Sequence, residues 1–497
     1  MSYINNRTLH DCRYRGFGSP AAFDVESAMP HMTAEQVESH TGGILLSGPR
    51  NAAIAGISID TRTLQPGDLF FAIRGPNNDG HAYLSSAIEK GAIGIVIDMQ
   101  GSPPANIPPD KIILQVPDTH RALKDLAACA RRQWRGSLIA ITGSMGKTTT
   151  KEFVAQVLQT EYSVYRSPGN YNNLFGLPLS LFGLTPDDHI GIFEMGMSAP
   201  GEIAEMCRIA RPDIGILTNV APVHLEFFGS IEEIARAKGE LAQALMPDGI
   251  FIYNADDPLV GRIAENFGGK KRSFGRSSQS DFQAKDIEIT GLEETRFGLV
   301  HEGVSLRATI PLAGVHYVMN LLPAVAMAHH YRIPMEQVLE SLRHLAQPGM
   351  RGRITRSHRG FTLIDDSYNS NPRALMQMVE TLSLIPGFRR KIVVAGEMLE
   401  LGKESTSLHY TCGEWTARHG IDVIIAVRGD AEAIARGARA TGMDSGQIHF
   451  FPEVEPSIHF VTELVKNGDL ILVKASRGVR ADRIAQALRE CAEGQVN

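Results

Sequence analysis

The chain has 497 residues, which is too long for one hydrophobic core and predicts two to four domains. Its 43% hydrophobic and 21% charged residues are ordinary for a globular protein. A net charge of −6 argues against a general nucleic-acid or membrane-surface binder, because such proteins are usually basic. No apolar run is long enough to span a bilayer. Together with the net charge, this means that neither nucleic acid nor a membrane is an expected partner.

The five cysteines are scattered and never form a Cys-x-x-Cys pair. This spacing argues against a disulfide framework or a cysteine zinc site and favours a reducing compartment, which we take to be the cytoplasm. Residues 1–31 contain no apolar segment of the kind found in a secretory signal. We expect them to be a disordered tail, or a start assigned too far upstream, because the first helix-like segment begins at Met32.

The first block of the chain, residues 32–134, alternates short strands with helices. A proline-rich stretch within it, residues 102–109, predicts a surface loop. The block is therefore expected to be a small α/β domain. Its predicted elements are strands at 56–60, 69–73 and 93–97 and a helix at 82–90.

The second block, residues 135–347, contains longer apolar runs, which suit strands buried on both faces of a parallel sheet. Residues 282–310 change to alternating polar and apolar positions, which predicts a small antiparallel insert. The other predicted elements are strands at 138–141, 191–193, 214–217 and 250–253, a helix from Lys147 towards Thr160, and a helix at 320–330.

The third block, residues 348–497, again alternates apolar strands with helical stretches. This alternation is typical of a doubly wound α/β domain. The predicted strands are 363–364, 391–395, 423–427 and 470–473.

A glycine-rich turn between a predicted strand and a predicted helix indicates a phosphate-binding loop. Gly143 and Gly146 let the backbone turn tightly and point its amides at phosphate oxygens. The start of the next helix adds the positive end of its dipole. Lys147 can balance phosphate charge, and the Thr148 hydroxyl can ligate Mg²⁺.

The loop departs from the strict Gly-x-x-x-x-Gly-Lys-Ser/Thr pattern, since Ile141 stands where the first glycine would be. A chance glycine-rich turn is the alternative, which the Lys-Thr-Thr continuation disfavours. We therefore predict an ATP site. Its loop residues would be Gly143, Ser144, Met145, Gly146, Lys147, Thr148 and Thr149.

Three further residues follow the next predicted strands. Glu194 ends a strand, where a carboxylate can hold Mg²⁺, although it could equally be a helix cap or a surface group. His224 follows the next strand and can bind metal or phosphate, while a lone histidine is more often structural. Lys238 lies on a helix and would ordinarily be a surface lysine.

Several phrases occur together in an order that resembles the Mur ligases, the ATP-dependent amide-forming enzymes of peptidoglycan synthesis. The resemblance covers nearly everything after Met32 and favours the members that add a dipeptide. The most diagnostic phrase is Asp-Asp-Ser-Tyr-Asn-Ser-Asn-Pro at residues 365–372. The others are Ser-Pro-Gly-Asn-Tyr-Asn-Asn at 167–173, Glu-Met-Gly at 194–196, Thr-Asn-Val at 218–220, His-Leu-Glu at 224–226 and Gly-Glu-Met-Leu-Glu-Leu-Gly at 396–402.

The resemblance implies three α/β domains: a UDP-substrate domain at 32–134, a central parallel-sheet ATPase domain at 135–347 and a C-terminal Rossmann-like domain at 348–497. It implies a reaction in which D-alanyl-D-alanine is joined to a UDP-N-acetylmuramoyl tripeptide through an acyl phosphate. The implied cofactors are ATP and Mg²⁺, with one ion near Thr148 and Glu194 and a second near His224 and a carbamylated Lys238. We expect the protein to act as a monomer.

The resemblance also assigns ligand contacts. Asn320 and Arg353 match positions that contact adenine and phosphate, and Asp365 matches the acid that touches the ATP ribose. Asp60, Thr61 and Arg62 match a motif that binds the UDP end of the substrate. The remaining implied substrate contacts are Asn170, Asn172, Asn173, Asp366, Tyr368, Asn369 and Asn371.

Four positions depart from the family pattern. Met145 and Tyr317 stand where asparagine is common, Ser370 replaces alanine, and Ala475 replaces a glycine. None removes a charged group needed for chemistry, and Tyr317 is the departure that lies nearest the implied adenine contact Asn320.

Two other functions fit parts of the pattern. A related ligase, such as folylpolyglutamate synthase or the Mur ligase that adds the third residue, is disfavoured by the phrase at 365–372 and by the Asp-Thr-Arg motif at 60–62. A nucleotide-regulated switch that ligates nothing is disfavoured by the intact set of Lys147, Glu194, His224 and Lys238, since a switch does not need a second metal.

Overall fold

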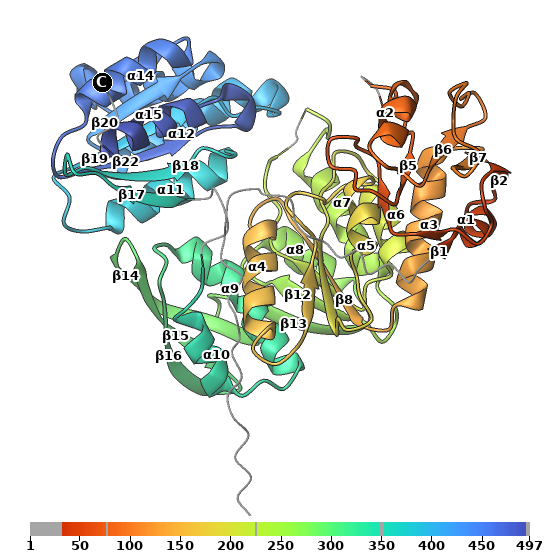
Figure 1. Cartoon of the computed structure of the whole chain (residues 1–497). Coiled ribbons are helices and arrows are strands. Elements are labelled where there is room, and N and C mark those ends of the chain that lie inside the picture. Colours follow the sequence, from red (N-terminus) through yellow and green to blue (C-terminus); the bar gives the residue numbers. More distant parts are fainter. Residues whose placement is uncertain (1–31, 76–77, 224–225, 347–351, 494–497) are drawn as a thin grey trace, which may run out of the picture. The chain divides into compact units, whose positions relative to one another are not determined.

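The computed structural model of the chain describes residues 32–75, 78–223, 226–346 and 352–493. Residues 1–31, for which a disordered tail or a start assigned too far upstream was predicted, lie outside this range. The chain divides into two compact units. One contains Ile44–Thr119 with the residues up to Gln36, and the other contains Val37–Gly43 and His120–Asn497 (Figure 1).

The first unit is built on a five-stranded sheet in the order β2-β7-β6-β5-β4. Strands β4 to β7 run parallel, and β2 joins the edge antiparallel to β7. Its helix α2 buries Leu84 and Ala87 against Phe70 and Ile95 of the sheet. Helix α1, Ala34–Thr41, runs from the first unit into the second. The other elements are β1 Met32–Thr33, β2 Ile44–Ser47, β3 Ala53–Ile54, β4 Gly56–Ser58, β5 Asp68–Phe71, η1 Gly80–Tyr83, α2 Leu84–Glu89, β6 Gly94–Asp98 and β7 Ile112–Val116.

The helix predicted at 82–90 begins at Gly80, and its first turn is a 3₁₀ helix. A 3₁₀ turn, η1, precedes α2, because the Asp79 side chain accepts a hydrogen bond of 2.9 Å from the His81 backbone N–H. An aspartate in this position satisfies a donor that the helix itself cannot pair, so the turn starts at Gly80.

A nine-stranded sheet, in the order β16-β15-β14-β13-β12-β11-β8-β10-β9, lies at the centre of the second unit. Strands β8 to β14 form parallel pairs, whereas β14, β15 and β16 pair antiparallel, as the alternating pattern at 282–310 predicts. The insert is not separate, because β14 continues the parallel sheet beside β13. The strands are β8 Ser137–Thr142, β9 Val164–Arg166, β10 Ile190–Glu194, β11 Ile214–Leu217, β12 Ile250–Asn254, β13 Lys270–Gly275, β14 Phe282–Gly291, β15 Glu294–His301 and β16 Val304–Ile310.

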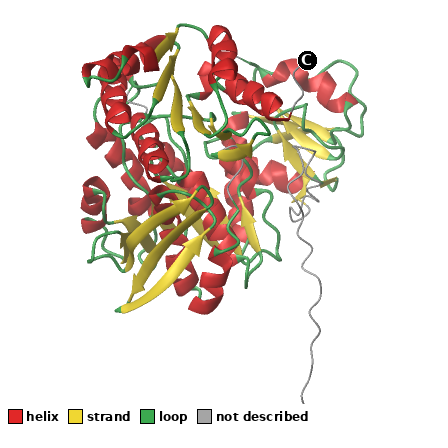
Figure 2. Cartoon of the chain, turned by 90° about the vertical axis from the view of Figure 1, so that its left-hand side faces the viewer, coloured by secondary structure: helices red, strands yellow, loops and turns green. Residues whose placement is uncertain are grey.

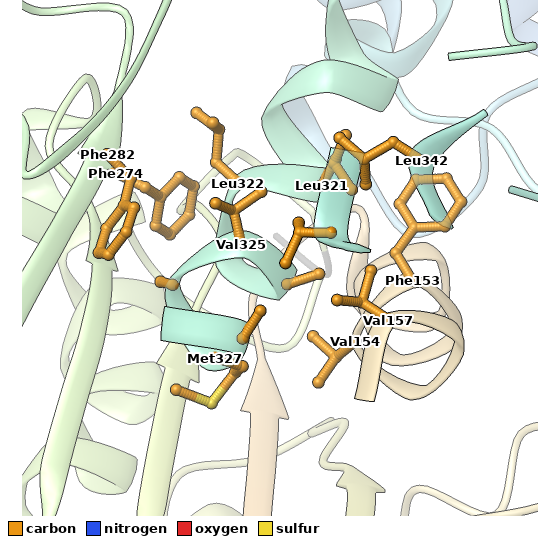
Figure 3. Packing of buried hydrophobic residues seen from close by; sticks show 14 of the residues in the cluster. Phe153, Val154, Val157, Phe274, Phe282, Leu321, Leu322, Val325, Met327 and Leu342 are labelled. Carbon is orange, nitrogen blue, oxygen red and sulfur yellow. The ribbon is translucent and has the colours of Figure 1, made fainter. Parts of the chain in front are cut away.

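Helices cover both faces of this sheet (Figure 2). On one face, α9 packs between Phe274 and Phe282 of the sheet and Phe153 of α4 (Figure 3). On the other face, Leu241 of α7 approaches Gly215 of β11. The helices are α3 Thr119–Gln133, α4 Lys147–Leu158, α5 Gly176–Leu181, α6 Glu202–Ala210, α7 Ile231–Ala244, α8 Pro258–Glu265, α9 Val315–His330 and α10 Met335–Leu342.

Helix α9 begins five residues before the predicted start at 320. The segment from Val315 to Met319 contains β-branched and aromatic residues, which lower helix propensity. Burial overrides this preference, because Tyr317, Val318 and Leu321 are all buried in the core. The predicted start at 320 was therefore too late.

The second unit also contains a six-stranded sheet in the order β17-β18-β22-β19-β20-β21, parallel except for β17. Alternate residues of β19 enter two different cores: Val393 packs with α11 to α13, and Val394 with α14 and α15. The elements are β17 Arg353–Arg356, β18 Thr362–Asp366, α11 Pro372–Leu384, β19 Arg390–Gly396, η2 Gly402–Glu404, α12 Ser405–Arg418, β20 Val423–Val427, η3 Gly429–Ala431, α13 Glu432–Ala440, η4 Ser445–Gln447, β21 Ile448–Phe451, α14 Val454–Leu464, β22 Asp469–Lys474, η5 Arg477–Val479 and α15 Asp482–Glu493.

The fold class is therefore the predicted one: α/β, with parallel sheets that carry helices on both faces. Among the described helices, none is both long enough and apolar enough to cross a membrane. Four cysteines lie in the described residues, and all four are free thiols: Cys129, Cys207, Cys412 and Cys491.

Candidate active site

The glycine-rich turn joins β8 to α4, and its backbone conformation favours glycine at two positions. Gly143 and Gly146 have φ angles of +148° and +78°, which side chains rarely adopt. A Cβ at Gly143 would lie 1.9 Å from the Thr218 hydroxyl oxygen. A Cβ at Gly146 would lie 2.1 Å from Oδ1 of Asn320. The two glycines thus allow the loop to pass directly against the next strand end and α9.

The loop is fixed by hydrogen bonds to Thr218 and Asn219, which follow β11. The Met145 N–H donates to Oδ1 of Asn219 at 3.0 Å, and the Thr218 hydroxyl donates to the Met145 carbonyl at 2.6 Å. The Ser144 N–H donates to the Asn219 carbonyl at 2.9 Å. Because the first amides of α4 have no intrahelical acceptors, this fixed loop presents N–H donors at the positive end of the helix dipole. Such an arrangement suits phosphate.

Lys147 is the first residue of α4. Its ammonium group donates to the Gly143 carbonyl at 2.8 Å, so it lies across the loop. Its charge acts on two buried groups: it lowers the pKa of Glu194 and the pKa of Lys238. Lys147 thus acts electrostatically on both Glu194 and Lys238 from its position across the loop.

Glu194 ends β10 and is only 3% exposed. One carboxylate oxygen accepts from the Thr148 hydroxyl at 2.6 Å, and the other accepts from the Asn172 amide at 2.7 Å. Burial acts to raise the pKa of Glu194, but the charge of Lys147, these two hydrogen bonds and the charge of Lys151 outweigh it. The pKa is therefore lowered, and the side chain is a carboxylate at neutral pH.

Lys238, in α7, is buried with 2% exposure, which excludes the ordinary surface lysine. Burial, and then the positive charge of Lys147, lower its pKa well below the usual lysine value. Neither cause is an acidic partner. Lys238 is thus held towards its neutral amine form, which is the nucleophilic form of lysine.

A cavity of about 370 Å³ lies over the phosphate loop. Its wall includes the loop from Ser144 to Thr149 together with Glu194, Asn254 and Asn320. On the other side it is lined by residues that end or follow β18 or lie on α11 and β22. These are Asp366, Tyr368, Asn369, Asn371, Arg373, Gln377 and Lys474.

The residues after β18 are held in place by a buried ion pair. Lys474 is 4% exposed, and its ammonium lies 2.5 Å from the Asp366 carboxylate and 3.1 Å from the Asn369 carbonyl. The Asn371 side chain caps α11 by accepting from the Ala374 N–H at 2.9 Å. The guanidinium of Arg373 lies 3.6 Å from the carboxylate of Asp257, at the start of α8. The Arg373 contact connects the six-stranded part of the unit to the nine-stranded sheet.

Three predicted ATP contacts do not line this cavity: Gly143, whose carbonyl accepts from Lys147, and Asp365 and Arg353. Asp365 is 5% exposed; its carboxylate pairs with Arg489 and accepts from the Ser367 hydroxyl at 2.6 Å. Arg353 begins β17 and lies on a different hollow beside Leu292 and Glu293. The geometry brings Asn320 to the loop, but it does not bring Asp365 or Arg353 there.

The three predicted loop asparagines play different structural parts. Asn172 holds Glu194, whereas the Asn173 side chain accepts from the Gly176 N–H at 2.8 Å at the start of α5. The Asn170 carbonyl accepts from the Asn172 N–H at 2.7 Å. None of the three lines the cavity. They shape the loop that positions Glu194.

The remaining predictions lie elsewhere. Asp60, Thr61 and Arg62 belong to the first unit, where Arg62 pairs with Asp60 at 2.6 Å. The Thr61 carbonyl accepts from Lys90 at 2.7 Å. His224 lies outside the described residues.

Comparison with known proteins identifies the family. The chain matches the Mur ligase family catalytic domain at residues 53–131, the Mur ligase middle domain at 141–328 and the Mur ligase glutamate ligase domain at 350–477. A Bacillus subtilis protein named UDP-N-acetylmuramoyl-tripeptide–D-alanyl-D-alanine ligase is 33% identical over 88% of this chain and 93% of its own length. This chain belongs to the Mur ligase family.

Solved Mur ligase structures agree with the fold. A crystal structure of MurF from Acinetobacter baumannii has a TM-score of 0.84 and 27% identity, covering 93% of this chain and 100% of that one. The MurF ligase of Thermotoga maritima in complex with ADP has a TM-score of 0.78 and 27% identity, covering 89% of this chain and 98% of that one. The resemblance inferred from the motifs is confirmed, and the chain is a ligase.

Two departures of this Mur ligase from the family pattern have structural consequences. Tyr317 is 7% exposed and packs 6.3 Å from the Phe153 ring, so its ring fills core space beside the cavity. Ala475 lies against Gly396, where an added Cβ would come within 2.4 Å of the Ala475 methyl group. The methyl of Ala475 is thus accommodated because β19 ends in glycine.

Several site residues of this Mur ligase escaped sequence reasoning. Asn254 ends β12, and Asn219 follows β11 after Thr218, in the Thr-Asn-Val phrase to which no site role was assigned. This position at the edge of a parallel sheet could have singled both out. His316 and Arg373 carry no such signal. They come to the cavity through the packing of α9 and α11, which a pattern of residues does not reveal.

Proposed function

We propose that this chain joins D-alanyl-D-alanine to a UDP-N-acetylmuramoyl tripeptide, converting ATP to ADP and phosphate, in the synthesis of peptidoglycan precursors. The observation that carries the proposal is one cavity that places the phosphate loop opposite Asp366, Tyr368, Asn369 and Asn371. The names of the relatives match this activity. The chain is an ATP-dependent ligase, and its site must therefore bring two anions together.

The loop residues from Gly143 to Thr149 would bind the ATP phosphates. The amides at the start of α4 would donate to phosphate oxygens, and Lys147 would leave the Gly143 carbonyl to face the γ-phosphate. Asn320, which touches the loop at Gly146, would lie beside the nucleotide. We retain Arg353 as a contact of adenine or phosphate and Asp365 as a ribose contact, although in this arrangement neither lines the cavity.

A carboxylate is a poor electrophile, so its oxygen must first acquire a leaving group. The terminal carboxylate of the tripeptide would attack the γ-phosphorus, and ADP would leave. The amine of D-alanyl-D-alanine would then attack the acyl carbon, lose a proton, and expel phosphate from the tetrahedral species. Lys147 would stabilise the charge on the transferring group, while the residues after β18 would position the dipeptide and exclude water.

The residues present fit Mg²⁺. Glu194 supplies a buried, ionised carboxylate whose oxygens face a hydroxyl and an amide, and Mg²⁺ prefers such oxygen ligands. Thr148 and Glu194 would hold the ion. When bound, it would balance the charge of the β- and γ-phosphates.

Lys238 would be carbamylated. A buried, neutral amine reacts with CO₂ to form a carbamate and release a proton, and this chemistry requires the lowered pKa found at Lys238. The product is an anion that could serve, with His224, as a ligand of a second ion. Catalytic roles therefore fall to Lys147, Glu194, His224 and Lys238.

We propose that the chain has three domains, at 32–134, 135–347 and 348–497. Asp60, Thr61 and Arg62 would bind the UDP end of the substrate, and the loop of Asn170, Asn172 and Asn173 would lie beside its peptide. We also propose that the enzyme acts in the cytoplasm, since the described cysteines are all free thiols, as in a reducing compartment.

Substrate dependence tests the activity. Phosphate release from ATP should require both a UDP-muramoyl tripeptide and D-alanyl-D-alanine. Release that needs glutamate and a folate would instead indicate a folylpolyglutamate synthase. A protein that binds ATP but releases no phosphate with either pair would be a nucleotide switch, and the proposal would be wrong.

Chemical rescue tests the carbamate. Lys238→Ala should be inactive, and short-chain carboxylates should restore part of the activity by occupying the place of the carbamate. Lys238→Ala with full activity, and with no response to carboxylates, would exclude the carbamate. Lys403, an exposed lysine, provides the control variant Lys403→Ala, which should keep normal activity with and without carboxylate.

A further inference from the structure

Two histidines and a glutamate meet at the end of a hairpin in the second unit. His301 is the last residue of β15, Glu302 follows it in the turn to β16, and His329 lies in the last turn of α9. One ligand atom from each lies within 4.8 Å of the others. None of the three lines the cavity over the phosphate loop, so the cluster is separate from the proposed catalytic site.

The hydrogen bond of His301 fixes its tautomer. Its Nδ1 lies 2.8 Å from the Asp281 backbone carbonyl, and a carbonyl can only accept. Nδ1 therefore carries the hydrogen, and Nε2 of the neutral ring has a free lone pair. Histidines that bind metals are oriented in this way, by an Nδ1–H donated to a backbone carbonyl.

Nε2 of His301 is buried and has no hydrogen-bond partner among the described residues. An unpaired buried polar atom is unfavourable, and a bound ligand would remove that cost at this nitrogen. It faces Glu302, whose carboxylate oxygen lies 3.8 Å away. The ring cannot easily turn elsewhere, because it stacks on Phe282 with centroids 4.1 Å apart. Phe282 is itself fixed in the core against α9 (Figure 3).

His329 completes the cluster from α9. Its ring meets the His301 ring edge to face, with centroids 4.4 Å apart. The His329 side chain is exposed, so an ion can reach it from solvent.

We propose that His301, Glu302 and His329 bind a divalent ion of the zinc class. Two imidazole nitrogens and one carboxylate oxygen are a ligand set that suits Zn²⁺, with bonds of about 2.0–2.2 Å. The side chain of Glu302 is 74% exposed, so it can rotate to bring its oxygen closer. Water would fill the remaining position. The ion would fasten the β15–β16 turn to the end of α9.

Calorimetry with Zn²⁺ as the only probe tests the site. The full-length, untagged chain, freed of metal by a chelator and held in excess Mg²⁺, should bind one Zn²⁺ that depends on the cluster. His301→Gln and His329→Gln should each weaken this binding by about tenfold or more, as expected for a lost ligand. Zn²⁺ should also raise the melting temperature of the unchanged chain and not that of either variant.

Matched controls distinguish the cluster from surface histidines. His330→Gln changes the next residue of the same helix, and His344→Gln breaks an exposed pair with Glu340. Both variants should bind Zn²⁺ as the unchanged chain does. His329 is exposed, so His329→Gln should fold even if His301→Gln does not. Zn²⁺ binding that is absent, or that is equal in all five proteins, would overturn the proposal.

Discussion

The two large sheets of the second unit have the same architecture but carry residues of different charge at the carboxyl ends of their strands. Both are mainly parallel and carry helices on both faces, and in both the carboxyl ends of the strands reach the cavity. Strand β8 ends in the glycine-rich loop, where Lys147 and the first amides of α4 concentrate positive charge. Strands β18 and β22 end in Asp366 and Lys474, which are register partners and neutralise each other.

This difference shows how one type of sheet can supply two kinds of surface. Parallel strands bring polar groups to one edge, but the residues at that edge decide its charge. The β8 edge suits a triphosphate. The β18 edge, with an internal ion pair and the amides of Asn369 and Asn371, suits a ligand that needs orientation more than neutralisation. The predictions below test this division.

The largest expected effect is on catalysis, at the β8 edge. In the proposed mechanism, Lys147→Ala removes the cation that would stabilise the transferring phosphoryl group, so kcat should fall by about 10²–10³-fold. Phosphate release in the presence of both substrates measures it. Lys285→Ala, at an exposed lysine of β14, should leave kcat unchanged. Near-normal turnover of Lys147→Ala would show that the positive charge at the β8 edge is not needed for phosphoryl transfer.

The next effect is on stability, at the β18 edge. Lys474→Met leaves the Asp366 carboxylate, 14% exposed, without its partner, and the free energy of unfolding should fall by about 3 kcal/mol. Urea unfolding measures the change. The double variant Asp366→Leu/Lys474→Met removes both charges and should lose less than Lys474→Met alone. A double variant that loses more unfolding free energy than Lys474→Met would mean that Asp366 stabilises the fold by contacts other than its ion pair with Lys474.

A third effect depends on pH. Burial, and then the charge of Lys474, lower the pKa of His316 to about 4 from 6.5. Between these values the unfolded chain binds a proton that the folded chain does not, so stability falls as the pH falls. His316 should account for a loss of about 2 kcal/mol between neutral pH and pH 5. Urea unfolding of His316→Gln should show a shallower pH dependence, whereas His459→Gln, at an exposed site, should behave as the unchanged chain.

The smallest expected effect distinguishes the cost of backbone strain at Gly146 from the effect of its close contact with Asn320. Gly146 and Gly201 both precede helices with left-handed φ angles, +78° and +86°. A Cβ would strike Asn320 at Gly146 but meets nothing within 4 Å at Gly201. Both alanine variants should lose about 1 kcal/mol from backbone strain. Gly146→Ala should in addition weaken ATP binding, measured by calorimetry; equal ATP affinity in the two variants would show that the loop does not need its contact with Asn320.

Much of the fold could be predicted because the relevant signals are local. Buried strands such as Ile214–Leu217 and Val423–Val427 are short continuous apolar runs, and the structure has them at the predicted bounds. The start of α9 could not be predicted, since only tertiary packing makes its first turn helical. The break into η1 and α2 depends on one side-chain cap that propensity does not reveal.

The site divides along the same lines. Lys147 and Thr148 were predicted from the glycine-rich turn between a strand and a helix, and Glu194 from its place at a strand end. The structure brings all three to the cavity, where Thr148 donates to Glu194. Lys238 could be proposed only through the family, because nothing in its sequence surroundings reveals its burial. Arg373 and His316 reach the cavity from α11 and α9 by packing between elements that lie far apart in the chain.

The transfer of an oxygen atom tests the central claim most directly. The tripeptide nucleotide would be labelled with ¹⁸O in its terminal carboxylate and incubated with ATP and D-alanyl-D-alanine, and the released phosphate would be analysed by mass spectrometry. If the cavity brings that carboxylate to the γ-phosphate, the phosphate should carry one ¹⁸O and the peptide product should retain the other. Unlabelled phosphate, formed together with the same product, would contradict the account.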